Sequence, residues 1–540
     1  MSSSPPASTQ PGQPAPFRWS GRWVEVCIGL VAWLFALVVV LPALGIAVQA
    51  WQGMQNGAGS VAGMRLLPLL GNTVTLAAAA GVLAVCIGLV GAWVVSRYHF
   101  AGRSLAVILL ASPLAVPPYV VAQFWLEVTG PGSAGSFLRS GFDASRLLVA
   151  ALIIGLCTSP LCFLILRAAV QRLDTTREDA AATLGVGPMG RVFRLVLPSL
   201  RPAWAAGLCL VALYACADFG VVESLGVRTF TQAIFFEQTL LEQDRALAWG
   251  RSAILALALL MLAVPLYLTE RATRGKARYE QQRSRSVRVQ TLGAAGTLGI
   301  WSLVFLVSGP TSLLVFGRCV YLLTGLEDVS RVWSNAFTAL GNSLIWACMA
   351  ATLGVVFAAI LSWVAARYRS TVHQALVPLA SIGYVLPGPV VALGALIVVT
   401  GWIPQWMGLY GTAGVLIFAY VVRYLPEALQ ASESGMAQVP RVLEEAARTL
   451  GRGPLGAFFH VTVPVLSGSL VAGWVFMFSA SMRELPATLM LKPLGSRTLS
   501  TEIWQSAQDS FYTDMAPATL LLLLSSTPAV LWLLLQRRSM

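Results

Sequence analysis

The most regular feature of the chain is a succession of long apolar runs separated by short polar connections. A helix that crosses the hydrocarbon core of a membrane needs about 20 mostly apolar residues. Twelve runs approach or reach that length, at residues 24–48, 69–95, 104–126, 147–167, 203–220, 252–268, 290–308, 343–366, 375–399, 409–426, 464–482 and 515–536. The pattern predicts an all-α polytopic membrane protein with about 12 transmembrane helices.

Composition and charge agree with this prediction. Of the 540 residues, 57% are hydrophobic and 11% are charged, whereas about a quarter of the residues of a soluble protein are charged. If every run crosses the membrane and the chain starts in the cytoplasm, most of the 36 Lys and Arg fall in cytoplasmic connections, as the positive-inside rule requires. We therefore expect both termini to be cytoplasmic, and the net charge of +13 requires no nucleic-acid partner.

The second half of the chain repeats the first. The pairs that share an offset of 270 residues are Asn72 and Asn342, Arg97 and Arg367, and Pro117 and Pro387. Farther on, residues 178–198 align without a gap to residues 444–464 at an offset of 266, and more than half of the aligned positions are identical. Because each half holds an even number of spans, the sequence predicts two parallel six-helix repeats with a pathway between them.

The repeats divide the chain into four parts. We expect a disordered cytoplasmic N-terminus at 1–20, a first repeat at 21–270, a basic cytoplasmic linker at 271–289 and a second repeat at 290–540. The arginines of the linker suit a solvated segment beside anionic lipid headgroups. A signal peptide cleaved after Ala50 is the alternative for the N-terminus, but the apolar stretch before that position is too long for one.

Each repeat places its longest polar segment between its fourth and fifth spans, at residues 171–201 and 437–467. Acidic residues start a short helix where the helix dipole favours them, two alanines follow, and Gly185 or Gly451 ends the helix in a C-cap position. A second helix starts near a proline that follows this glycine. The pattern predicts a compact knob of two short helices, present once in each half, that docks into a groove on a partner.

These segments contain no sign of nucleotide chemistry. Both satisfy G-x-G-x-x-G, but an alanine-rich helix precedes the glycines where a dinucleotide site needs a strand. The chain has no G-x-x-x-x-G-K-S/T phosphate loop. The three histidines are scattered, and the eight cysteines lie in or beside apolar runs without C-x-x-C spacing, so we expect small core cysteines and no metal site.

Both polar segments resemble the EAA loop of ATP-binding-cassette (ABC) importer permeases, and they are named EAA loop 1 (171–201) and EAA loop 2 (437–467) below. The family pattern is Glu-Ala-Ala, a Gly four residues after the second Ala, and a Pro thirteen residues after that Gly. The residues of loop 2 that match it or directly precede it are Glu444, Glu445, Ala446, Ala447, Gly451 and Pro464. The corresponding residues of loop 1 are Glu178, Asp179, Ala180, Ala181, Gly185 and Pro198. Asp179 replaces the glutamate of the family in loop 1, where we expect Glu178 to compensate.

The resemblance implies a type I ABC importer permease fold in the bacterial inner membrane, and no cofactor bound by this chain. ATP would be used by two copies of an ABC ATPase subunit, one under each EAA loop, and a soluble substrate-binding protein would dock on the outer side. The implied mechanism is alternating access, in which the loops move with the ATPases and the halves rock about a central cavity. The chain itself would then be a pore subunit and not an enzyme.

The substrate is less closely defined. Asp218 and Glu484 are equivalent carboxylates after the fifth span of each half, and hard cations prefer oxygen ligands. A plainer interpretation is that they cap helices or pair with Arg483. Most of the chain resembles the fused ferric-iron permeases, especially at 218–223 and 483–493, which implies ferric iron as the substrate and a path along Asp218 and Glu484. Fused permeases for thiamine and for aminoethylphosphonate remain alternatives.

Two other classes of protein are possible for twelve spans. A secondary transporter of six plus six spans buries ionisable residues at mid-membrane, whereas we expect the charges here to lie in loops and near span ends. An intramembrane enzyme needs a converging nucleophile, base or set of metal ligands within the spans, and the sequence contains no such set.

Overall fold

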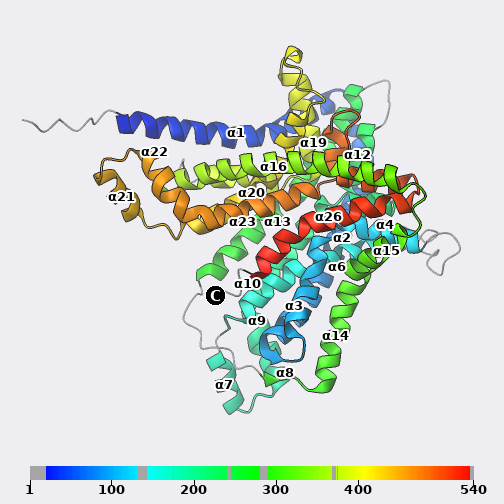
Figure 1. Cartoon of the computed structure of the whole chain (residues 1–540), viewed down its shortest axis with the longest axis vertical. Helices are drawn as coiled ribbons and strands as arrows, with labels where there is room; N and C mark the ends of the chain where they lie inside the picture. Colours follow the sequence, from blue (N-terminus) through cyan, green and yellow to red (C-terminus); the bar gives the residue numbers. More distant parts are fainter. Residues whose placement is uncertain are drawn as a thin grey trace, which may run out of the picture.

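The computed structural model describes residues 20–129, 143–173, 175–239, 245–279, 290–367, 373 and 375–535. Helices make up nearly all of this part of the chain (Figure 1). Two short strands, β1 (Tyr98–His99) and β2 (Gln290–Thr291), pair in parallel and join the start of the second half to the first. Residues 1–19 of the predicted disordered terminus and 280–289 of the predicted linker lie outside the described residues.

The long helices follow the predicted apolar runs in both halves. Those of the first half are α1 (Ser20–Gln55), α2 (Ala58–Arg97), α3 (Arg103–Ala111), α4 (Pro118–Val128), α6 (Asp143–Val170), α10 (Arg201–Ala217) and α13 (Arg245–Tyr279). Those of the second half are α14 (Ala294–Ser308), α15 (Leu314–Leu323), α16 (Val329–Arg367), α18 (Leu376–Ala380), α19 (Gly388–Ile397), α20 (Ala413–Met436), α23 (Val463–Met482) and α26 (Tyr512–Leu535). Because α13 runs to Tyr279, the first repeat extends into the segment predicted as a linker from residue 271.

Within the described residues, seven helices are long and apolar enough to cross a membrane, or up to ten if each of three bent pairs counts as one span. Two further helices, α20 and α26, are not in that set, although each has 24 residues and a length of about 36 Å. They correspond to the predicted runs at 409–426 and 515–536, and adding them gives the predicted twelve. The helix α20 differs from the others because it carries Arg423 and Glu427 in its middle.

The third span of each half is broken, which corrects the prediction of continuous helices at 104–126 and 375–399. The two parts of the span are bent by 90° between Ala115 and Pro118 and by 111° between Tyr384 and Gly388. The proline at each break, Pro117 or Pro387, has an extended backbone, with ψ of 137° and 154°. A proline lacks the N–H that would continue the helix, and it disfavours helical backbone before it.

The two halves interlock through their first spans. The first-half helix α1 packs against α18 and α19 of the second half, and α14 of the second half packs against α3 of the first. The backbones of α1 and α19 touch, because a Cβ on Gly394 would lie 2.4 Å from the carbonyl oxygen of Pro42. Small residues permit such close approach between membrane helices.

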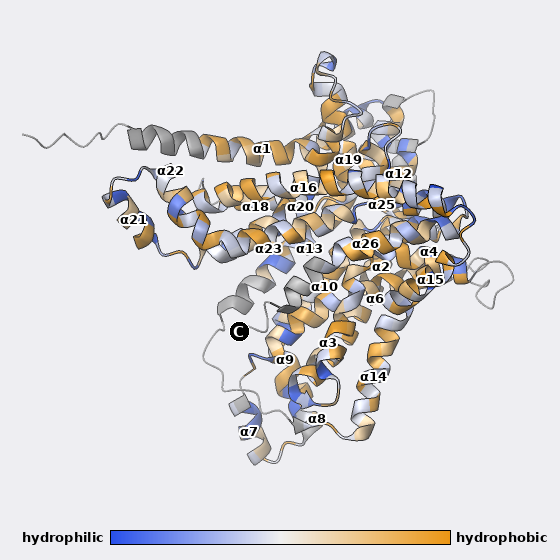
Figure 2. Ribbon diagram, viewed as in Figure 1, coloured by the Kyte–Doolittle hydropathy of each residue, from blue (hydrophilic) through white to orange (hydrophobic). Residues whose placement is uncertain are grey.

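The halves meet at one end of the molecule and diverge toward the other. Figure 1 shows them together near α4, α12 (Phe230–Thr239) and α15. They lie apart toward α7 (Thr175–Thr183) and α8 (Pro188–Arg191) in one half and α21 (Arg441–Thr449) and α22 (Pro454–Ala457) in the other. In Figure 2 the long helices are predominantly apolar, and hydrophilic residues gather at their ends and in the connecting segments. The start of α1 lies on the same side as α21 and α22, which it contacts through α22 (Pro454–Ala457).

The repeat seen in the sequence reappears in individual hydrogen bonds. The side-chain amide of Asn72 donates to the carbonyl oxygen of Arg228 at 2.9 Å, and that of Asn342 donates to the carbonyl oxygen of Arg497 at 2.9 Å. These bonds tie the start of the second span of each half to the segment after the fifth. The predicted parallel duplication is therefore confirmed.

Candidate functional site: two EAA loops and a central cavity

The EAA loops have the predicted shape in both halves. In loop 1, α7 (Thr175–Thr183) is followed by α8 (Pro188–Arg191), and in loop 2, α21 (Arg441–Thr449) is followed by α22. Gly185 and Gly451 lie between the helices with φ of 79° and 88°, a left-handed backbone that favours glycine. The next amide, of Val186 or Arg452, donates to the carbonyl five residues back at 3.0 Å, which closes a Schellman C-cap.

One carboxylate anchors each loop to the end of its second span. Glu178 accepts two hydrogen bonds from the guanidinium of Arg97, at 2.5 and 3.2 Å. Glu444, at the equivalent position, accepts two from Arg367 at 2.8 and 2.9 Å. Glu178 is paired with Arg97 as Glu444 is with Arg367, so its equivalent in loop 2 is Glu444. That Glu178 also compensates for Asp179 stays a prediction.

The second anchor is more complete than the first. Besides Arg367, the hydroxyl of Thr462 and the indole N–H of Trp363 donate to Glu444, at 2.5 and 3.3 Å. The residue is only 8% exposed. Burial alone would raise the pKa of Glu444, but the hydrogen bonds from Arg367, Thr462 and Trp363 outweigh burial and hold that pKa below its ordinary value.

This pKa predicts a pH dependence. A carboxyl group whose folded pKa is depressed stabilises the fold above its unfolded pKa, about 4.3 for glutamate, and loses that contribution as the pH falls through the folded pKa. We expect the melting temperature of the wild type to exceed that of Glu444→Gln by a constant amount from pH 8 to pH 5, and the difference to shrink in more acidic buffer. Thermal unfolding of both proteins in detergent, at each pH, measures this difference in melting temperature. A difference that is unchanged at pH 3 would contradict the depressed pKa.

The faces of the loops away from these anchors are exposed. Asp179 and Glu445 are exposed with the first alanine of each motif, whereas the second alanine, Ala181 or Ala447, is buried. Three apolar side chains are exposed at equivalent positions of each loop, namely Leu184, Met189 and Phe193 in loop 1 and Leu450, Leu455 and Phe459 in loop 2. Leu184 is 83% exposed and Leu450 is 85% exposed. We did not single out these side chains from the sequence, although their shared offset of 266 marks them.

The helix that follows each loop is distorted in both halves but broken in only one. Five-residue π-helical segments cover Val192–Val196 and Phe458–Thr462, just before Pro198 and Pro464. In the first half the chain then bends by 64° before α10, where Pro202 lies in the first turn. Its counterpart in the second half is Gly468, and there α22, the π-helical segment and α23 form one span from Pro454 to Met482. The connection from loop to pore is therefore straighter in the second half.

A cavity of about 270 Å³ lies between the halves. Its wall consists of pseudo-equivalent segments: 113–119 with 383–386, 157–161 with 423–427, and 210–220 with 480–486. The first pair comes from the broken third spans, the second from the middle of α6 and α20, and the third from the ends of α10 and α23. A second cavity of about 380 Å³ adjoins it and extends along α20 past Gln430 and Ser434 toward EAA loop 2.

Five charged side chains line the first cavity: Asp218, Arg423, Glu427, Arg483 and Glu484. The expectation that charges lie only in loops and near span ends is therefore wrong. Two of them, Arg423 and Glu427, come from the middle of α20, Arg423 within the predicted apolar run 409–426 and Glu427 directly after it. These two residues have no ionic counterparts in the first half, where Cys157 and Leu161 occupy the positions of Arg423 and Glu427.

The two predicted path residues, Asp218 and Glu484, both line the cavity and both cap the short helix that follows. Asp218 accepts a hydrogen bond from the amide of Val221 at 2.9 Å, and Glu484 accepts one from the amide of Ala487 at 3.2 Å. Glu484 is 4% exposed and pairs with Arg423 at 3.3 Å, not with Arg483. The structure therefore brings the two carboxylates to one cavity, each with a structural partner.

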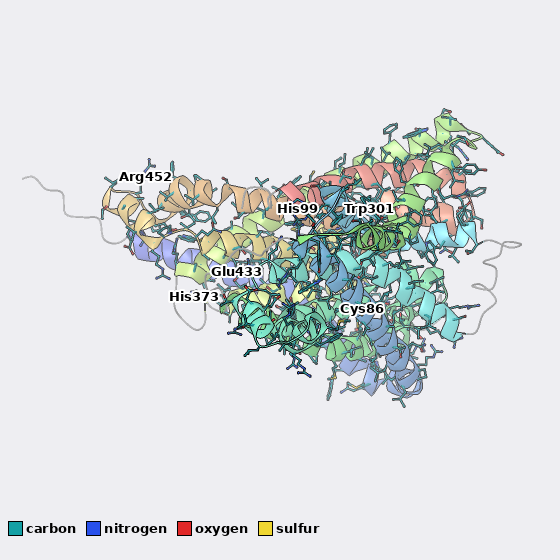
Figure 3. The ribbon with its side chains drawn as sticks, turned by 90° about the horizontal axis from the view of Figure 1, so that it is seen from below. Cys86, His99, Trp301, His373, Glu433 and Arg452 are labelled. Carbon is teal, nitrogen blue, oxygen red and sulfur yellow. The ribbon has the colours of Figure 1, made fainter. Side chains whose placement is uncertain are left out.

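Histidine and cysteine chemistry does not add to this site. Figure 3 labels His99 and His373, which come from β1 and from the segment between α16 and α18 and do not converge. Of the cysteines in the described residues, those at 157, 162, 209, 216 and 319 are buried, as predicted for small core residues, whereas Cys86 is exposed on α2. Among the described residues no three His, Cys, Asp or Glu side chains are grouped to hold a metal ion. A helix precedes each G-x-G-x-x-G segment, where the dinucleotide-binding motif has a strand.

Comparison with known proteins identifies the family to which this chain belongs. Residues 84–274 and 354–540 each match the family described as the binding-protein-dependent transport system inner membrane component. The chain belongs to this family. The two matches start 270 residues apart and end 266 residues apart, the same offsets that relate the halves. The protein is therefore a fused ABC importer permease, a multi-pass inner-membrane pore subunit of a system that also has an ATPase and a substrate-binding protein.

Individual relatives match the chain to different extents. The Fe(3+)-transport system permease protein FbpB 2 of Haemophilus influenzae is 28% identical over 506 residues, which cover 93% of this chain and 96% of the relative. The ferric transport system permease protein FbpB of Actinobacillus pleuropneumoniae is 24% identical, and the match covers 83% of this chain and 68% of the relative. The sulfate transport system permease protein CysW of Escherichia coli is 29% identical over 262 residues, 47% of this chain and 88% of the relative.

Proposed function

We propose that this permease imports ferric iron, driven by ATP that separate subunits hydrolyse. The observation that carries the proposal is the near full-length similarity to a relative named as an Fe(3+) permease, whereas the sulfate permease matches only about half of the chain. The cavity supports a cation, because three carboxylates and two guanidinium groups line it and Arg423 pairs with Glu484. Oxygen donors are the ligands that hard cations prefer.

The EAA loops are the proposed docking sites for two ATPase subunits, one at each loop. Each loop offers a partner the exposed carboxylate of Asp179 or Glu445 beside three exposed apolar side chains. On its opposite side, each loop is held to the end of the second span by an ion pair, Arg97 with Glu178 in loop 1 and Arg367 with Glu444 in loop 2. We place these loops and both termini in the cytoplasm, with the substrate-binding protein at the opposite end, where the halves meet.

Transport would proceed by alternating access. ATP draws the ATPases together, and the loops follow because their anchors transmit the movement to α2 and α16. The halves then close around the second cavity and open at the end where they now meet. The substrate would pass through the first cavity, and the chain itself would bind neither ATP nor another cofactor.

Docking predicts a selective effect of Glu445→Ala. The residue is exposed, so the substitution leaves the stability of the chain nearly unchanged, as surface substitutions do. We expect an ATPase subunit that co-purifies with the wild type to be lost or reduced about tenfold, which corresponds to about 1.4 kcal/mol of contact energy. Asp179→Ala should have a smaller effect, because its carboxylate is one methylene shorter. The control is Glu327→Ala, an exposed position outside both EAA loops. Equal ATPase recovery in all four proteins would contradict docking through the motif.

The substrate is tested by uptake in cells that lack this chain. Radiolabelled ferric iron should enter the complemented cells and not the deletion cells. Normal iron uptake in the deletion cells, with thiamine or aminoethylphosphonate uptake lost, would overturn the choice of ferric iron and leave the permease assignment intact.

A further inference from the structure

We infer that Glu427 is a transient oxygen ligand for the cation as it moves from the first cavity to the second. This role differs from those of the EAA loops and of the helix-capping carboxylates Asp218 and Glu484. The inference rests on the proposed cation substrate. Five residues line both cavities, namely Leu114, Leu161, Tyr384, Glu427 and Arg483. Glu427 is the carboxylate among them, so a cation that moves between the cavities passes it.

The other charged groups of the cavity have structural partners. Glu484 is held by Arg423 and by the hydroxyl of Tyr424. Arg483 donates to the carbonyl oxygens of Ser479 and Leu114, at 3.0 and 2.5 Å, and so joins the two halves. In the described part of the chain, no hydrogen bond and no ion pair within 4 Å engages the carboxylate of Glu427. The charges of Arg483 and Arg423 act on it from a distance.

A second oxygen near this route is also unpartnered. Tyr119 lines the first cavity and is only 5% exposed, and its hydroxyl oxygen is buried without a hydrogen-bond partner. A buried hydroxyl without a partner is costly, and such groups call for an explanation in a native structure. Oxygen donors are the ligands that hard cations prefer, and a cation in the first cavity, or its bound water, would satisfy the hydroxyl of Tyr119.

The repeat provides a position at which the ligand can be rebuilt. Leu161 is the first-half counterpart of Glu427, and it also lines both cavities. The carboxylate ligand therefore comes from the second half alone, from α20, and α6 of the first half has no equivalent. A carboxylate moved from residue 427 to residue 161 would still project toward the junction of the cavities from the other side of the pseudo-two-fold axis.

The first test is ATP-driven ferric uptake by the purified complex in proteoliposomes. Glu427→Gln keeps the shape of the side chain and removes its charge, so we expect uptake to fall about tenfold, the size of one lost charge-assisted contact. The ATPase activity that the loaded binding protein stimulates should persist. The double variant Glu427→Leu with Leu161→Glu should recover uptake to within about threefold of the wild type, a rescue that a purely structural role of Glu427 would not give. The exposed Glu327→Gln, which lines neither cavity, is the control.

A direct binding measurement keeps this inference separate from the choice of substrate. Terbium(III) is a hard trivalent cation whose luminescence is excited through a neighbouring tyrosine ring. We expect terbium titration of the wild-type complex to give a luminescent site that Glu427→Gln weakens at least fivefold, that Tyr119→Phe weakens less, and that Glu327→Gln leaves unchanged. If the wild type imports no ferric iron, the proposed function fails, and the terbium result alone decides the inference. Wild-type terbium binding and wild-type uptake by Glu427→Gln would overturn it.

Discussion

Arg367→Ala is expected to uncouple ATP hydrolysis from transport and to lower uptake by more than tenfold. The substitution leaves the carboxylate of Glu444 buried without its bidentate partner, and breaking a buried ion pair from one side costs about 3 kcal/mol or more. The loss falls on the contact between α21 and the end of α16, so EAA loop 2 should detach from the pore while the spans remain folded. ATP-dependent uptake and basal ATPase activity of the purified complex measure both effects.

A graded series identifies the cause of this loss. Arg367→Lys keeps the charge but not the planar fork that both carboxylate oxygens accept, so we expect an intermediate defect. Arg97→Ala, the same change in the first half, should cost less because Glu178 has neither the threonine nor the tryptophan donor that supports Glu444. Equal effects of Arg97→Ala and Arg367→Ala would contradict the difference between the two anchors.

Glu484→Ala is expected to be the most destabilising of the cavity substitutions, by about 3–5 kcal/mol. The substitution leaves the guanidinium of Arg423 without its carboxylate partner beside the cavity. It also removes the hydrogen bond that Glu484 accepts from the amide of Ala487 at the start of the next helix. The matched control is Asp218→Ala in the first half, which loses only a helix cap worth about 1 kcal/mol. Thermal unfolding of the detergent-solubilised chain measures both free energies.

A double variant separates the lost ion pair from the lost cap. Replacing both partners, with Arg423→Met and Glu484→Met, removes the uncompensated charge and should recover most of the stability that Glu484→Ala loses. If the double variant is as unstable as Glu484→Ala, the cost lies in the cap or in the packing, and the ion pair is not the cause.

The parts of the fold that local chemistry determines were predictable from the sequence. Gly185 and Gly451 take the left-handed backbone that ends a helix, and Pro188 and Pro454 start the next one. The register of the two halves followed from shared residues alone, and it recurs in the amide bonds of Asn72 and Asn342.

The parts that depend on tertiary contacts were not predictable. Arg97 and Arg367 marked the repeat in the sequence, but their ion pairs were not predicted, because their partners lie about 80 residues away along the chain. Glu427 was counted within the connection after an apolar run, although α20 continues to Met436 and places this carboxylate in the cavity. Periodicity and composition do not reveal which span ends face a cavity.

A secondary transporter would also bury ionisable residues like those that line the first cavity. The residues of the pore therefore do not by themselves identify the energy source. The central claim is therefore tested most directly by transport in a defined system. Proteoliposomes that contain this chain with its ATPase subunits should accumulate radiolabelled ferric iron only when ATP and the loaded binding protein are both supplied, and an imposed ion gradient should not replace ATP. Accumulation driven by a proton or sodium gradient, in vesicles that contain this chain without any ATPase, would contradict the account.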